Sequence, residues 1–250
     1  MRRSVGGTRV LAEAGICLSL LLLLFSGCNR EYWEAGPPQA ESRTIKLGDA
    51  TSARVEIEMG AGELSVGPGA QDLLEADFTY AGPGARPKVD YNVSGGQGRV
   101  TIRQSGGVQG PRGGSNTWDL HLNNKVPLTL KVEQGAGRSR LVLGGLALSD
   151  LEVQIGAGET LVDLGGEWKK DLTAKIEGGV GKATVRLPSQ VGVRARAQGG
   201  IGAVNVHGLK KDGDAYVNEA YGKSPVTIRI EIEGGIGEIN LETSEAPPSV

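Results

Sequence analysis

The side chains best suited to acid–base chemistry in this 250-residue chain are its 29 aspartates and glutamates and its two histidines. Cleaving a polysaccharide needs two carboxylates about 5–10 Å apart, or a carboxylate-bound calcium beside a base. Here the acidic residues mostly alternate with arginine and lysine, as on the solvated face of a sheet, and His121 and His207 have no partner near them in the sequence. We therefore expect no catalytic residue and no enzyme activity.

Two segments resemble calcium-binding loops only in part. Asp212-Gly213-Asp214 lacks the ligands that follow in an EF-hand loop, and the glycine-rich stretch 178–183 has Ala183 where a calcium repeat requires aspartate. The glycine triplets of the chain precede strand-like segments, so no helix N-terminus follows them to hold a phosphate. The sequence predicts neither a metal site nor a cofactor.

Cys28 is the residue for which we expect covalent chemistry. Three arginines precede an apolar run at 16–25, which is too short to span a membrane, and the run ends in Phe25-Ser26-Gly27-Cys28. These four residues resemble a bacterial lipobox, in which the cysteine is lipidated and becomes the new N-terminus. We expect residues 1–27 to be a lipoprotein signal peptide and Cys28 to bind membrane lipid; the alternative is an ordinary signal peptide with an incidental cysteine.

The net charge of the chain limits its possible partners, and its cysteine content limits its possible disulfides. The net charge is −2, and removal of the leader, which holds three arginines, would make the remainder more acidic, so nucleic acid is an unsuitable partner. Cys17 lies in the leader, so the mature chain retains Cys28 alone and forms no internal disulfide. The expected location is the bacterial cell envelope, at the outer membrane where the cell has one.

Alternation of apolar and polar residues dominates the chain after residue 44. In 226–233, for example, valine and isoleucine alternate with threonine, arginine and glutamate, and the segments 53–59, 128–133 and 151–155 behave in the same way. This period of two indicates strands with one buried face. The sequence predicts an all-β fold.

Six Gly-x-Gly triplets punctuate these strands. Glycine is 41 of 250 residues, against about 7% in ordinary proteins, and it falls between the apolar runs. Triplets from Gly135 onward recur at intervals of 21, 23, 21 and 35 residues. We expect both glycines of each triplet to adopt positive φ at a corner, with two or three short strands in each coil of a β-solenoid. The predicted corner glycines are Gly60, Gly62, Gly135, Gly137, Gly156, Gly158, Gly179, Gly181, Gly200, Gly202, Gly235 and Gly237.

The spacing of the glycine triplets and the local composition predict the domain organisation. Residues 28–43 read as a tether, 44–104 as an N-terminal β domain, 105–116 as a linker, 117–242 as the repeat array and 243–250 as a disordered tail. A polar insert at 207–224 belongs to the last coil, where it would shield the open edge of the sheet.

Several segments resemble the bacterial toast-rack family. They are 59–64 (Met-Gly-Ala-Gly-Glu-Leu), 72–80, 86–91, 100–104, 116–123 and 127–132 with the triplet at Gly135. The resemblance covers about residues 44–242. It implies a right-handed single-stranded β-solenoid, similar to the C-terminal part of cell-wall-active antibiotic response proteins, and it carries no catalytic residue.

Taken together, these features predict a lipid-anchored, non-catalytic structural or interaction module of the cell envelope. A link to envelope stress rests on the family resemblance alone, and adhesion is a related role. Its partner would be an envelope protein or a glycan. The alternative is a β-helix that binds or cleaves glycans, because parallel β-helices host polysaccharide lyases and hydrolases.

Overall fold

The computed structural model describes residues 37–106 and 116–244, which form a single 13-stranded sheet. The one helical segment among them is a 3-10 turn, Pro83–Ala85, so none of the described segments is a helix long and apolar enough to cross a membrane. The signal peptide, Cys28, most of the predicted linker and most of the predicted tail lie outside the described residues. The strands are β1 (Gln39–Ile45), β2 (Ser52–Pro68), β3 (Leu74–Tyr80), β4 (Pro87–Ser94), β5 (Gln97–Gln104), β6 (Asn116–Leu122), β7 (Leu128–Val142), β8 (Leu148–Asp163), β9 (Leu172–Pro188), β10 (Gly192–His207), β11 (Lys210–Asp212), β12 (Ala215–Val217) and β13 (Thr227–Ser244).

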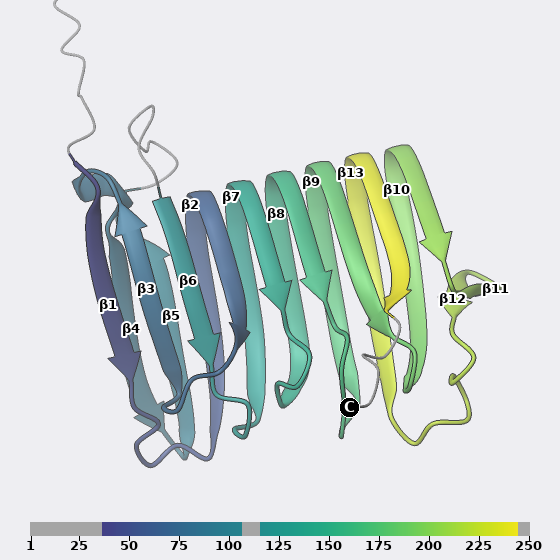
Figure 1. The fold of residues 1–250 in the computed structure, drawn as a ribbon, viewed down its shortest axis with the longest axis horizontal. Coiled ribbons are helices and arrows are strands. Elements are labelled where there is room, and N and C mark those ends of the chain that lie inside the picture. Colours follow the sequence, from purple (N-terminus) through teal and green to yellow (C-terminus); the bar gives the residue numbers. More distant parts are fainter. Residues whose placement is uncertain (1–36, 107–115, 245–250) are drawn as a thin grey trace, which may run out of the picture. The chain divides into compact units, whose positions relative to one another are not determined.

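Six long strands, each bent at its glycine triplet, stack in parallel as the rungs of a β-solenoid (Figure 1). They are 15 to 18 residues long, and each ladder of backbone pairing runs on through the bend. We expected two or three short strands in each coil. A single continuous strand forms instead, because the glycines let the chain turn without losing its neighbours above and below. The all-β solenoid predicted from the sequence is confirmed.

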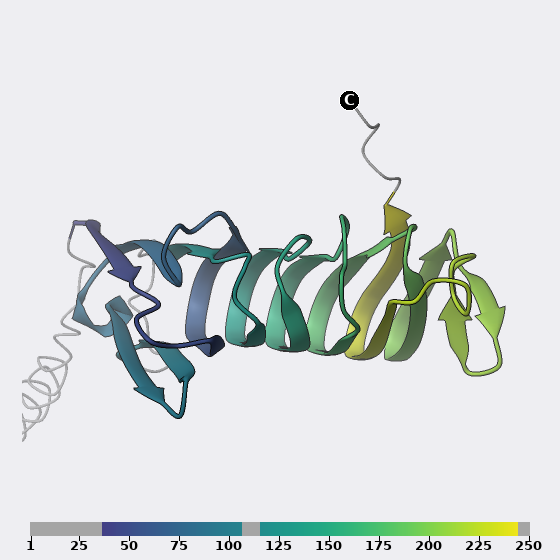
Figure 2. The same ribbon diagram turned by 90° about the horizontal axis from the view of Figure 1, so that it is seen from below.

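The rungs do not stack in chain order. Their spatial order is β2, β7, β8, β9, β13, β10, so the last strand of the chain lies between β9 and β10 (Figure 1). We expected the last glycine triplet to form the terminal coil. In the structure β10 is the end rung, and the predicted insert at 207–224 carries the hairpin β11–β12, which pairs with β10 only at Arg194 and Ala195 (Figure 2).

The N-terminal end of the stack is extended by two short groups of strands. The half of β2 after its bend pairs with β6, then β3, then β1, while the half before the bend pairs with β5 and then β4. Three expected boundaries differ from the strands: β1 begins within the expected tether, β6 begins at the end of the expected linker, and β13 extends two residues into the expected tail. Each of these segments has a neighbouring strand to pair with, which composition alone does not reveal.

The core consists of inward side chains that repeat from rung to rung. One column joins Ile57, Val132, Val153, Ile176 and Ile232, all at most 2% exposed, in register across the five successive rungs β2 to β13. At the N-terminal end Trp118 packs edge-on against Phe78, with ring centroids 5.5 Å apart. Close packing of similar aliphatic side chains therefore holds the bends in line.

Candidate interaction surface

The predicted corner glycines form two columns along the bend of the stack. A Cβ on the first glycine of five triplets would overlap the carbonyl oxygen of the corresponding glycine in the adjacent rung, and the same holds for the second glycine. The second glycine of all six triplets has φ between +126° and +145°. We expected positive φ at both glycines, but the first has an ordinary φ and is needed for close approach alone. The ten overlapping positions are Gly135, Gly137, Gly156, Gly158, Gly179, Gly181, Gly200, Gly202, Gly235 and Gly237.

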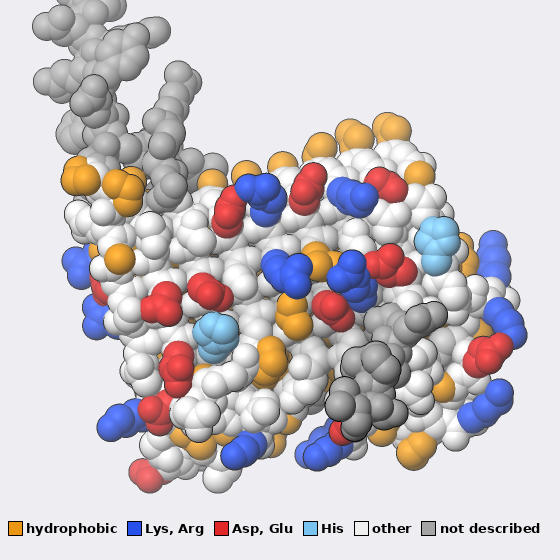
Figure 3. All heavy atoms as spheres, viewed as in Figure 1, with side chains coloured by type: hydrophobic (Ala, Val, Ile, Leu, Met, Phe, Trp, Pro, Cys, Tyr) orange, Lys and Arg blue, Asp and Glu red, His pale blue; other side chains and the backbone are white. Residues whose placement is uncertain are grey.

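The middle residue of each triplet points outward at the bend. It is alanine in β2, β7 and β8, and changes to Val180 in β9, Ile236 in β13 and Ile201 in β10, which lie in register. These three side chains are 54%, 53% and 72% exposed, and we call them the apolar crest. Figure 3 shows hydrophobic side chains along this upper edge of the stack. A contiguous exposed aliphatic row is a feature of binding surfaces, whereas single exposed aliphatics are common.

Charged side chains flank the crest in two columns of alternating sign. In spatial order the column before the bend is Glu56, Lys131, Glu152, Lys175, Glu231 and Arg196. The column after the bend is Glu63, Arg138, Glu159, Lys182 and Glu238.

Some of these neighbours form ion pairs across rungs. Lys131 lies 3.4 Å from Glu152, and Lys182 lies 3.7 Å from Glu238. A hydrogen bond to Glu133 in its own strand raises the pKa of Lys131, and Glu152 contributes in the same direction. Opposite charges therefore alternate along these two columns, whereas across the six rungs the column next to the bend carries Glu58, Glu133, Glu177 and Glu233 and no basic residue.

The two outward arginines of the end rung are also neutralised. Arg194 and Arg196 lie 3.2 and 2.8 Å from the carboxylate of Asp214, which the hairpin β11–β12 holds beside them. Glu231 separates Arg196 from Lys175, so these basic residues do not join into a basic ladder.

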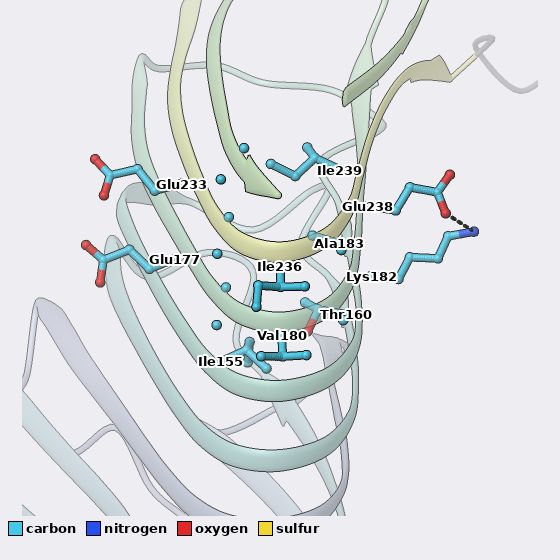
Figure 4. A pocket seen from close by; sticks show the side chains of 18 of the residues that line it. Ile155, Thr160, Glu177, Val180, Lys182, Ala183, Glu233, Ile236, Glu238 and Ile239 are labelled. Atoms are coloured by element: carbon cyan, nitrogen blue, oxygen red, sulfur yellow. Dashed lines mark ion pairs between the residues drawn. The ribbon is translucent and has the colours of Figure 1, made fainter. Parts of the chain in front are cut away.

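Inside the bend, a small cavity of about 40 Å³ lies behind the crest (Figure 4). It forms because the inward position before the bend is Met59, Gln134 and Ile155 in the first three rungs, and glycine in β9, β13 and β10. The Thr160 hydroxyl lines the cavity and has no hydrogen-bond partner. Pockets for small molecules are about 300–1,000 Å³, so this cavity is a packing defect and no ligand site.

The histidines and acidic residues are not brought together into a reactive group. His121 on β6 lies 3.3 Å from the carbonyl oxygen of Pro68 and 3.7 Å from Asp119, while His207 ends β10 at the far end of the stack. Within 37–106 and 116–244, no group of three or more histidine, cysteine or acidic side chains is arranged to hold a metal ion.

The crest is the feature that sequence reasoning missed. Its signal was present in the change of the middle residue from alanine to valine or isoleucine in the last three triplets. The three residues form one exposed row only because β13 places Ile236 between Val180 and Ile201. Sequence periodicity could not supply this order.

Comparison with known proteins places this architecture in a family. The model of the N-terminal domain of toast_rack, DUF2154, matches residues 34–186. The crystal structure of a candidate cell adhesion protein from Clostridium sporogenes is similar, with 30% sequence identity and a TM-score of 0.77 over 83% of this chain and 100% of that one.

A candidate adhesin from Bacteroides fragilis matches over 81% of this chain and 97% of that one, at 11% identity and a TM-score of 0.28. Among curated proteins, none matches. The matched family model spans the N-terminal strands and the first rungs, whose geometry is described above. The chain belongs to the toast-rack family, of which it carries the N-terminal domain.

Proposed function

We propose that this chain is a non-catalytic adhesion module, displayed at the bacterial cell envelope and anchored there by lipid on Cys28. The observation that carries the proposal is the apolar crest, an exposed aliphatic row that three consecutive rungs hold in register. The similar protein from Clostridium sporogenes is described as a candidate cell adhesion protein, and this supports the same role here.

The form of the surface favours contact with a macromolecule. The crest is convex, because its residues occupy the outside of the bend, and it is flanked by cross-rung ion pairs such as Lys131–Glu152 and Lys182–Glu238. A partner that buries the crest would gain about 25 cal/mol for each Å² of apolar surface removed from water. A connection with envelope stress rests on the family resemblance.

The crest can be tested by cross-linked pull-down from intact envelopes. We compare the wild-type chain with Val180→Ser/Ile236→Ser and, as a matched control, with Ala136→Ser/Ala157→Ser in the alanine part of the same row. Partners recovered by the wild type and the control but lost from the crest variant would support the proposal. Equal recovery by all three would contradict it.

The anchor can be tested separately by cell fractionation. Cys28→Ala should move the protein from the membrane pellet to the soluble fraction, whereas Cys17→Ala in the leader should leave it in the pellet. Membrane retention of the Cys28→Ala chain would remove the anchor from the proposal and leave the crest untouched.

Glycan binding is a second candidate, favoured by a shallow groove beside the crest. The groove is lined by outward Glu133, Gln154, Glu177 and Glu233 and by the first glycines of the triplets. Carboxylates and an amide of this kind can accept or donate hydrogen bonds to sugar hydroxyls. A glycan array discriminates: binding that is lost on Glu177→Ala/Glu233→Ala but kept by the crest variant would favour a glycan as the ligand.

A further inference from the structure

The two ends of the rung stack differ in how their bends are covered. At β2, the Gln104 side chain accepts hydrogen bonds from the backbone of Gly60 and Ala61, at 2.9 and 3.4 Å, and Asn116 donates to the carbonyl oxygen of Ala61 at 2.7 Å. At β10, the strand found on the outer edge in the described part of the chain is β12, and it reaches Arg194 and Ala195 alone. The backbone edge from residue 197 to 206 therefore has no strand beside it there.

This open edge lacks the devices that normally protect the edge of a sheet. Exposed edge strands usually carry charges or proline, which prevent another strand from pairing. Residues 197–206 (Ala-Gln-Gly-Gly-Ile-Gly-Ala-Val-Asn-Val) contain neither. The charged residue that directly precedes this segment, Arg196, forms an ion pair with Asp214.

The inward side chains of β10 also lack a neighbouring rung to cover them. Val204 and Val206 are only half-buried, although their register partners in β13, Ile239 and Leu241, are 4% and 0% exposed. Among the large hydrophobic side chains of residues 37–106 and 116–244, Ile201 is the most exposed, at 72%. Another rung on β10 would bury the two valines as β13 buries its own inward residues.

We infer that a second copy of this chain supplies that rung, through antiparallel pairing of β10 with β10 about a two-fold axis at the bend. The uncovered segment 197–206 is centred between Ile201 and Gly202. Pairing about this centre sets inward residues opposite inward residues and outward opposite outward. The pairs are Ala197 with Val206, Gln198 with Asn205, Gly199 with Val204, Gly200 with Ala203, and Ile201 with Gly202.

Shape favours a second copy over another occupant. A half-turn about the axis that bisects the bend exchanges the two arms of β10, so a bent strand meets a partner with the same bend. The inward valines of each copy then face the small residues Ala197 and Gly199 of the other, and no like charges meet within the paired segment. Head-to-tail stacking is disfavoured, because Gln104 and Asn116 cover the bend at the N-terminal end.

The mass of the full chain in detergent micelles tests this inference. The expected dimer does not depend on the lipid anchor. We expect wild type and Cys28→Ala to have twice the protein mass of one chain and Ile201→Lys to have the mass of one chain. Val180→Lys, a matched crest substitution two rungs inside the stack, should remain a dimer. A wild-type chain that is monomeric at every concentration, or an Ile201→Lys dimer as stable as the wild type, would overturn the inference.

Cross-linking locates the axis. Rungs lie about 4.8 Å apart, so the two copies of residue 201 would be about one rung apart and the two copies of residue 180 about five. A bis-maleimide that spans two rungs should cross-link Ile201→Cys but not Val180→Cys, with the wild type as the control for the native cysteines. Equal cross-linking of the two variants would exclude this arrangement.

Discussion

Glu238 of β13 lies 3.7 Å from Lys182 of β9, although β10 stands between these strands in the sequence. In this column the charges alternate in sign because the strands stack in the order β9, β13, β10. Stacking in the order of the sequence would not give this alternation. If β10 followed β9 directly, Arg196 would lie beside Lys175 in the column before the bend; with β13 between them, both basic residues face Glu231. Like charges directly opposite each other destabilise a sheet, so the columns of Lys175 and Lys182 favour the observed order, whereas the column of Glu177 and Glu233 places two acidic residues side by side.

Reversing one charge of β13 tests this account. Glu231→Lys should lower the midpoint of thermal unfolding, because lysine would then oppose Lys175 and Arg196. The matched control is Glu233→Lys, two residues away on the same face, where the neighbours in register are Glu177 and Gln198. The control should lose no stability, because it replaces the like-charge contact with Glu177 by a contact between opposite charges, and the difference between the two variants should shrink in high salt. If both variants lost the same amount of stability and added salt did not change this loss, charge would not select the strand order.

Three neighbouring glycines of β9 should respond differently to alanine. A Cβ at Gly178 would enter the cavity with no atom closer than 4.0 Å, so Gly178→Ala should stabilise the fold by about 0.4–1 kcal/mol. Gly179→Ala would overlap the carbonyl oxygen of Gly156, and Gly181→Ala would overlap that of Gly158 and strain a φ of +137°.

Urea unfolding measures these three effects. The strain at Gly181 alone is worth about 1–3 kcal/mol, and the overlap adds to it, so this variant should be the least stable. Losses of the same size at Gly178 and Gly181 would contradict the stacking of glycine on glycine.

Asn218 should be essential for the connection between β9 and β10. Its buried side chain donates to the carbonyl oxygens of Pro188 and Val191, at 3.1 and 2.7 Å, and accepts from the backbone of Val193 at 3.0 Å. Asn218→Ala leaves these groups without a partner, and each buried unsatisfied group costs about 1–3 kcal/mol. A variant as stable as the wild type in urea would show that water replaces the asparagine at no cost.

Acid should weaken the attachment of β13 to the turn before β9. The pKa of Asp171 is lowered by the hydrogen bond from the Thr227 backbone, at 2.9 Å, and by Arg229, at 3.0 Å. A carboxylate with a lowered pKa in the folded state contributes stability above its unfolded pKa of about 3.9 and loses it as the pH falls through the folded value.

Unfolding measured between about pH 5 and pH 2 tests this contribution, which is small because the pair is exposed. Asp171→Asn should be less stable than the wild type at neutral pH and should lose less stability on acidification. Parallel pH curves for the two chains would show that Asp171 carries none of the acid sensitivity.

The sequence predicts the class of the fold because its two signals are local. Alternation in 226–233 marks a strand without reference to any neighbour, and the triplet at Gly235 marks its bend. The position of that strand between β9 and β10 depends on pairing between distant segments, which alternation cannot encode. The crest follows from the same long-range order, and β1 was missed because its residues lack strong alternation while β3 provides the pairing.

The most direct test of the proposed adhesion role is attachment of living cells. Cells that display equal amounts of the wild-type chain, Val180→Ser/Ile236→Ser or Ala136→Ser/Ala157→Ser are compared with cells that lack the protein, on a surface to which the parent strain adheres. We predict that wild type and the alanine-row control attach alike and that the crest variant falls to the level of cells without the protein. Attachment by the crest variant equal to that of the wild type, or no effect of removing the protein, would contradict the account.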